Sequence, residues 1–131
     1  KIGFFDDNFF IYLEEIDLCR RVKNLNKKII LDPSIKIKHS GGTSHDKIID
    51  HEMELSRNWH WMWSSFYYNK KYNGYLIALI KALPKLTTSV FKMLFYLTIF
   101  NKIKRKIYFQ RFSGLFNSIL GKKSWYRPKV F

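Results

Sequence analysis

The sequence predicts an α/β fold followed by a basic helical tail, and three patterns lead to this prediction. Residues 9–13 are mostly aromatic or apolar, as in a strand or a buried turn. Residues 35–39 alternate strictly between apolar and polar types, which is typical of a half-exposed strand. Residues 14–25 and about 46–73 instead carry apolar residues at three- and four-residue steps, the period of a helix.

The first elements surround a group of acids. Residues 1–13 are expected to pack at the edge of a sheet. A helix over about 14–25 follows, because acids in a first turn complement the helix dipole. Asn26 is a candidate left-handed cap for its end. A short apolar strand is expected at 28–31, and a turn at 32–34 leads into the alternating strand.

Three carboxylates stand at the start of this first helix. Glu14 and Asp17 share one face at a spacing of three, while Glu15 is rotated away from them. A carboxylate at a strand-to-helix junction, next to aromatic residues, suits a general base. Acids at a helix start are more often caps or solvated charges, so the residues alone leave both interpretations open.

The region also resembles a known family. It is similar to the later half of the catalytic domain in family 2 glycosyltransferases, especially the bacterial rhamnosyltransferase-like branch. The resemblance covers residues 2–45. It rests on an ordered set of matches: Gly3, Phe5, Asp6, Asp7, Phe9, Phe10, Tyr12, Glu14, Glu15, Asp17, Leu18, Arg21, Pro33, His39, Gly42 and Ser44. Two positions depart from the family, which usually has Asp where this chain has Glu15 and more often Glu where it has Asp7.

The resemblance implies the fold and the roles of several acids. It implies the C-terminal portion of a GT-A (nucleotide-diphospho-sugar transferase) domain, the nucleotide-binding half being expected before Lys1. Glu15 would be the catalytic base, and Glu14 and Asp17 would assist it. Asp6 and Asp7 would bind the acceptor.

The resemblance also implies a divalent cation, Mg²⁺ or Mn²⁺, with His39 as one ligand and the other ligands in the preceding half. A neutral imidazole is a suitable ligand for such metals. Without the resemblance, His39 would be interpreted as a surface histidine at a strand end. His45, His51 and His60 match no zinc spacing and are interpreted as surface or interface residues.

The long helix over about 46–73 carries Arg57. The resemblance suggests that Arg57 binds the donor phosphate, because a guanidinium group suits phosphate; a structural salt bridge or capping contact is the alternative. Trp59, Trp61 and Trp63 are more typical of packing or of a membrane-interface belt than of a sugar platform.

Charge divides the chain in two. All ten acids lie within residues 1–54, whereas residues 55–131 hold fifteen Lys and Arg and no acid. Within residues 75–100 four positions, Lys81, Lys85, Thr88 and Lys92, share one helical face and the others are largely apolar, which indicates a helix lying in the membrane interface. A buried, partner-facing helix is the alternative. Pro84 is expected to kink or break it.

These patterns divide the chain into 1–46 as the catalytic part, 47–74 as a long helix packed on it, and 75–131 as a basic, amphipathic, membrane-associating tail. The expected function is an inverting glycosyltransferase moving a sugar, such as rhamnose, from a nucleotide-sugar donor to a cell-surface polysaccharide or lipid-linked glycan. Its expected location is the cytoplasmic face of the bacterial inner membrane, as a peripheral protein at an anionic surface, with no nucleic acid as partner. A basic nucleic-acid-binding module and a non-catalytic membrane-anchoring domain are the alternatives.

Overall fold

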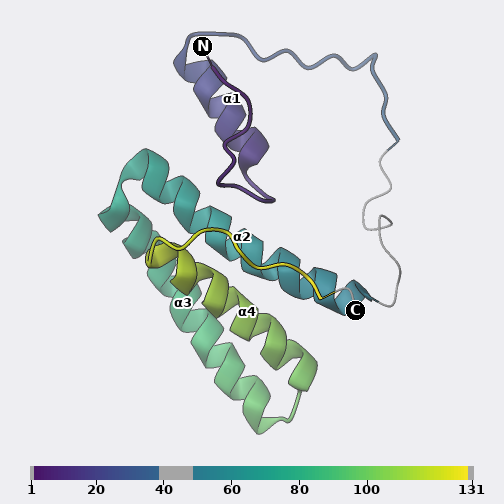
Figure 1. The fold of residues 1–131 in the computed structure, drawn as a ribbon, viewed down its shortest axis with the longest axis vertical. Coiled ribbons are helices and arrows are strands. Elements are labelled where there is room, and N and C mark those ends of the chain that lie inside the picture. The colour runs from purple at the N-terminus through teal and green to yellow at the C-terminus, as the bar shows by residue number, and fades with distance from the viewer. Residues whose placement is uncertain (1, 39–48, 130–131) are drawn as a thin grey trace.

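The computed structural model describes residues 2–38 and 49–129, which form four helices (Figure 1). They are α1 (Glu14–Asn24), α2 (Asp50–Asn73), α3 (Tyr75–Thr98) and α4 (Lys102–Ile119). Helices α2, α3 and α4 pack against one another. The prediction of an α/β fold, and with it the GT-A assignment, is wrong, because the described residues contain helices and no strand.

The two predicted strands after α1 are absent for a physical reason. Residues 28–31 and 35–38 lie in an exposed segment, and Leu31 and Ile37 are 90% and 84% exposed. A strand needs a neighbour to take its backbone hydrogen bonds, and none lies beside this segment in the part of the chain described. Only the predicted turn forms there, where Asp32 accepts a hydrogen bond of 2.9 Å from the Ser34 backbone.

The aromatic block before α1 is not a strand either. Tyr12 and Leu13 have φ angles of 70° and 71°, a left-handed conformation that is uncommon for side-chain-bearing residues. These two residues turn the chain into α1, and the aromatic rings before them contact α2. Phe9 meets Tyr67 edge-on, with ring centroids 4.9 Å apart. The aromatic character of this block therefore serves helix contacts rather than a sheet.

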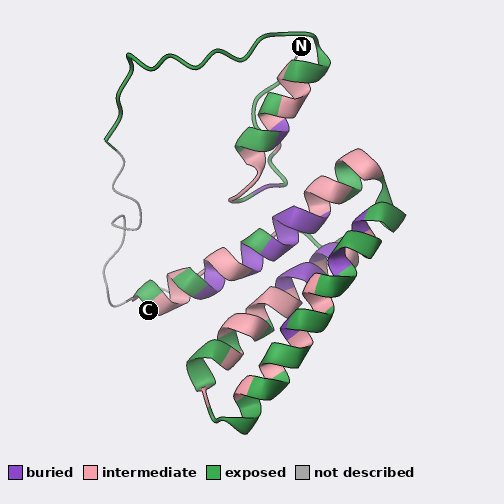
Figure 2. Cartoon of the chain, turned by 180° about the vertical axis from the view of Figure 1, so that it is seen from behind, coloured by how far each residue is buried: buried purple, intermediate pink, exposed green. Residues whose placement is uncertain are grey.

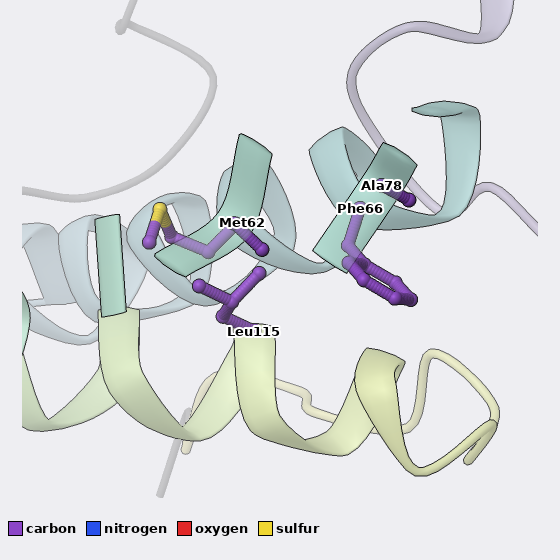
Figure 3. Packing of buried hydrophobic residues seen from close by; sticks show 5 residues of the cluster. Met62, Phe66, Ala78 and Leu115 are labelled. Carbon is purple, nitrogen blue, oxygen red and sulfur yellow. The ribbon is translucent and has the colours of Figure 1, made fainter. Parts of the chain in front are cut away.

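Helix α2 is the centre of the bundle. One side of it supplies Met62 and Phe66 to a core completed by Ala78, Ala82 and Leu115 from the other two helices (Figure 3). Buried residues follow α2 through its middle, as Figure 2 shows. The predicted long helix is thus confirmed over residues 50–73; its first predicted residues, 46–48, lie outside the described part.

Helix α3 presents an unusual distribution of side chains. Its buried residues are the small Ala78, Ala82 and Ser89. Its lysines point toward the neighbouring helices, because Lys81 and Lys85 donate hydrogen bonds of 3.2 and 2.6 Å to α2 residues. Eight large apolar residues are instead exposed by between 48% and 73%: Leu76, Ile77, Ile80, Leu83, Phe91, Leu94, Phe95 and Leu97. The apolar stripe therefore faces away from the bundle.

Pro84 was expected to kink or break this helix, and the break does not occur. The helix continues through it from Tyr75 to Thr98. A proline inside a helix removes one backbone hydrogen bond. Buried Ala82 and Ser89 on either side of Pro84 hold both halves of α3 against the bundle, which offsets this loss.

Residues 102–119, with five Lys and Arg and with Gly114, form a single helix, α4. Asn101 begins it, since its side chain accepts a 3.0 Å hydrogen bond from the Lys104 backbone. The chain then runs back along α2 as an extended tail, residues 122–129 (Figure 1). Among the described helices, none combines the length and apolar character needed to cross a membrane.

Candidate functional site

The N-terminal arm, residues 2–24, is attached to α2 by a charge network around one buried acid. Asp17 is fully buried and accepts hydrogen bonds from Arg21 Nε at 2.8 Å and from the Tyr72 hydroxyl at 2.7 Å. Lys71 Nζ lies 2.6 Å from Asp17 and 2.7 Å from Asp6. Lys71 therefore joins the two carboxylates and connects α1 and the preceding loop to α2.

The network holds both acids in the charged form. Burial alone would raise the pKa of Asp6, but hydrogen bonds from Lys71, Asn8 and Tyr67 outweigh burial and lower it to about 2. Burial likewise opposes the bonds from Lys71, Tyr72 and Arg21 that lower the pKa of Asp17. Both carboxylates are thus saturated with donors, and this arrangement suits them to positioning rather than to proton transfer.

A separate hollow of about 200 Å³ lies where the arm meets an earlier part of α2. Tyr12 from the arm and Arg57, Asn58 and Trp61 from α2 line it. Tyr12 and Trp61 meet edge-on, with ring centroids 5.5 Å apart. Burial and the Glu14 charge raise the pKa of Tyr12, while the Arg57 charge opposes them. The hollow thus combines two aromatic rings with a guanidinium group and an amide.

Glu14 is the first residue of α1 and does not itself line this hollow. Its Oε2 atom is buried and accepts no hydrogen bond from any residue that the structure describes. A buried carboxylate oxygen without a donor is costly, so a ligand hydroxyl would satisfy it. The two consecutive left-handed residues, Tyr12 and Leu13, lie just before Glu14, and such strain is concentrated at functional positions.

The other residues predicted for the site are spread more widely. Glu15 is exposed on the first turn of α1. Asp7 is exposed and lines a different hollow, of about 280 Å³, together with Phe10 and Arg127 of the tail. His39, the predicted metal ligand, lies outside the described residues. Arg57 therefore lines one hollow with Tyr12, whereas Asp6 and Asp17 meet at Lys71.

The interpretation of His60 as a surface or interface residue is wrong, because its side chain is fully buried. Its Nε2 lies 2.9 Å from the Tyr126 carbonyl oxygen and its Nδ1 lies 3.0 Å from the Ser124 hydroxyl. The neutral imidazole that donates from Nε2 and accepts at Nδ1 fits both partners. His60 therefore fastens the C-terminal tail to α2, beside the ring of Phe10.

The His60 contacts predict a pH-dependent stability. Burial, assisted by the Arg127 charge, lowers the pKa of His60 from 6.5 to about 4, so the folded chain favours neutral imidazole. This contribution is fully present above pH 6.5 and is lost as pH falls toward 4, by about 3 kcal/mol in total. Urea unfolding measured from pH 7 to 4 should show that slope. His60→Gln, which keeps a donor and an acceptor, should flatten it; an unchanged slope would contradict the assignment.

Several of these groups could not be found from the sequence. Tyr12, Asn58 and Trp61 line the first hollow because the arm folds back on α2, which no local pattern indicates. The aromatic residues at three- and four-residue spacings along α2 indicated that this helix is packed. They do not reveal which face of the helix meets the arm. Trp59 and Trp63 are buried, in agreement with the packing interpretation, while Trp61 is 45% exposed at the hollow.

The chain has no match among known proteins: no family model, no curated protein and no solved structure resembles it significantly. The resemblance to family 2 glycosyltransferases therefore stays a prediction from the motif of residues 2–45.

Proposed function

We propose that the chain takes part in inverting glycosyl transfer, from a nucleotide-sugar donor to a cell-surface polysaccharide or lipid-linked glycan acceptor, at a membrane surface. The hollow formed by Tyr12, Arg57, Asn58 and Trp61 carries the proposal. Aromatic rings pack on sugar rings, an amide hydrogen-bonds hydroxyls, and guanidinium binds phosphate. In this proposal the four helices act beside a nucleotide-binding part elsewhere in the whole protein.

The residues divide into contacting and positioning groups. Arg57 would bind the donor phosphate. The Oε2 atom of Glu14, which has no partner among the described residues, would accept a hydrogen bond from a hydroxyl group of the sugar acceptor. Glu15, which is exposed on the first turn of α1, would accept the proton as the base. Asp17 would hold α1, and with it both glutamates, against α2 through Lys71. Donor binding and proton transfer would then depend on a rigid contact between α1 and α2.

The residues described in the structure do not form a metal centre by themselves. Residues 2–38 and 49–129 contain no group of three or more His, Cys, Asp or Glu side chains placed to hold an ion. His39 as a ligand of Mg²⁺ or Mn²⁺ stays a prediction of the motif. The roles proposed above therefore involve only side chains of this chain.

The outward face of α3 supports the membrane part of the proposal. Large apolar side chains such as Ile80 and Phe91 are 66% and 71% exposed there. Residues 55–131 carry fifteen Lys and Arg and no acid, which complements an anionic lipid surface. A helix with apolar residues outside and small or cationic residues inside is suited to an apolar environment on its outer side. A peripheral position at the cytoplasmic face of the inner membrane fits this arrangement.

The proposal predicts the behaviour of two variants in the whole protein. Glu15→Gln should lower sugar transfer by about 10²-fold or more while donor binding is kept, because only the base is lost. Arg57→Gln should instead weaken donor binding by about tenfold, because it removes a charge-assisted hydrogen bond. Transfer and binding would be measured with a panel of nucleotide sugars in the presence of Mg²⁺ or Mn²⁺.

Matched controls lie in the exposed segment after α1. Asp32→Asn and Lys28→Gln make the same charge changes away from the hollow and should leave transfer and donor binding unchanged. Full transfer activity in both Glu15→Gln and Arg57→Gln would refute the proposed site. Equal losses in the controls would show that overall charge, rather than the hollow, is responsible.

A further inference from the structure

A second hollow, of about 260 Å³, lies between α3 and α4 and gathers positive charge. Lys85 and Arg111 line it from opposite helices, together with Thr88 and Tyr108. Lys92 donates a 3.1 Å hydrogen bond to the Tyr108 hydroxyl, and its ammonium lies 5.1 Å from the Tyr108 ring centroid. Two cations thus line one space, and the third, Lys92, contacts one of its lining residues.

No carboxylate balances these cations. Residues 55–131 contain no acid, and neither Lys85 nor Arg111 forms an ion pair with a described residue. The Nε atom of Arg111 is buried and meets no hydrogen-bond acceptor within residues 2–38 and 49–129. A buried guanidinium N–H without an acceptor is costly, and so is a like charge beside it.

The two cations affect each other. Burial first, and then the charge of Arg111, lower the pKa of Lys85. Lys85 keeps one hydrogen bond, to the Ser65 hydroxyl at 2.6 Å. An anion between Lys85 and Arg111 would remove the repulsion and supply the acceptor that Nε lacks.

We propose that this hollow between α3 and α4 binds a phosphate group, held by Lys85 and Arg111. Planar guanidinium and ammonium donors together suit phosphate oxygens, and the Tyr108 and Thr88 hydroxyls line the same space. The ligand is a phosphate monoester, diester or diphosphate. Its source is either a lipid headgroup or a soluble phosphate compound.

The neighbouring surface relates the hollow to a membrane. Thr88 and Pro84, which line it, lie on α3 next to the outward apolar residues Leu83 and Phe91. A lipid-linked phosphate could thus enter the hollow while its chain remains on the apolar stripe. In this form the inference rests on the proposed function, in which such a phosphate must be held near the acceptor.

Binding of inorganic pyrophosphate to the full chain tests the inference and requires no sugar transfer. Calorimetry should detect binding by the wild type, and Arg111→Gln and Lys85→Gln should each weaken it by about tenfold or more. Lys106→Gln, an exposed residue of the same helix, removes one charge outside the hollow and should change binding by less than about twofold. Circular dichroism would verify that every variant is folded.

Vesicles separate the two sources. The wild type would be sedimented with phosphatidylcholine vesicles with and without phosphatidic acid, in the presence or absence of pyrophosphate. If pyrophosphate competes with vesicles that contain phosphatidic acid, and Arg111→Gln binds these vesicles more weakly than the wild type, the hollow binds the phosphate of a lipid headgroup. If pyrophosphate binds but does not compete with the vesicles, the hollow binds a soluble phosphate compound. Phe91→Ser with Leu94→Ser should reduce vesicle binding without affecting pyrophosphate.

Two results would overturn the inference. One is the absence of pyrophosphate binding combined with vesicle binding that does not depend on Arg111. The other is an equal effect of Lys106→Gln and Arg111→Gln, which would show a diffuse positive field instead of a site. Because neither result involves transfer, failure of the inference is distinguishable from failure of the proposed enzymatic function.

Discussion

Replacing Gly114 with alanine is expected to destabilise the bundle by at least about 3 kcal/mol. A Cβ atom at Gly114 would lie 2.2 Å from the backbone carbonyl oxygen of Trp59, so α4 would have to move away from α2. The obstacle is backbone, and no side-chain replacement at position 59 can relieve it. Thermal unfolding should show a midpoint lower by roughly 10 °C or more.

Gly121 provides the matched control. Its φ angle is 72°, but a Cβ atom there would meet nothing within 4 Å. Gly121→Ala should therefore cost only the backbone strain of a left-handed residue, about 1–2 kcal/mol. If Gly114→Ala were no less stable than Gly121→Ala, the close approach of α2 and α4 would be incorrect.

The second large effect is expected for Asp17→Asn. The substitution removes the charge that Lys71 and Arg21 share in a fully buried position while keeping the shape of the side chain. The loss should be about 1–3 kcal/mol, because Asp17 is fully buried and loses its charge, while the partly exposed Lys71 keeps Asp6 as a partner. Hydrogen exchange should then show faster exchange along α1, and urea unfolding should show the loss of stability.

Asp7→Asn is the control for this prediction. Asp7 is adjacent to Asp6 but exposed, so its stability effect should stay within about 0.5 kcal/mol. A loss below about 1 kcal/mol for Asp17→Asn would mean that the arm is held mainly by its aromatic contacts with α2. The comparison therefore separates the charged and aromatic parts of the attachment.

The sequence indicated the helices better than it indicated the fold. Helix 14–25 and the long helix ending at residue 73 were predicted from apolar spacing and acidic first turns, and both are present. The prediction of strands was wrong because the alternation at residues 35–39 shows only that the segment could form a strand. A strand also requires a neighbouring strand to pair with. The GT-A assignment came from the motif and failed with the strands.

The candidate site was predictable in its residue types but not in its grouping. Arg57 and Glu14 were singled out from the motif, and Arg57 lines one hollow with Tyr12. Asp17 was expected beside Glu14 on one helix face, yet two of its three partners, Lys71 and Tyr72, come from α2, 54 and 55 residues further along the chain. Charge pairing across elements depends on tertiary packing, which the helical period of α1 does not contain.

The exposed segment of residues 25–38 has a consequence for how the arm stays in place. It makes no helix or strand and is exposed throughout, and as part of the connection between the arm and α2 it keeps the arm at a high effective concentration beside that helix. A protease should cut there first, since exposed backbone is the preferred substrate. After such a cut the arm would still be bound through Lys71 and the aromatic contacts, but as a separate peptide that dilution releases. Assembly of the proposed site would then become a bimolecular equilibrium.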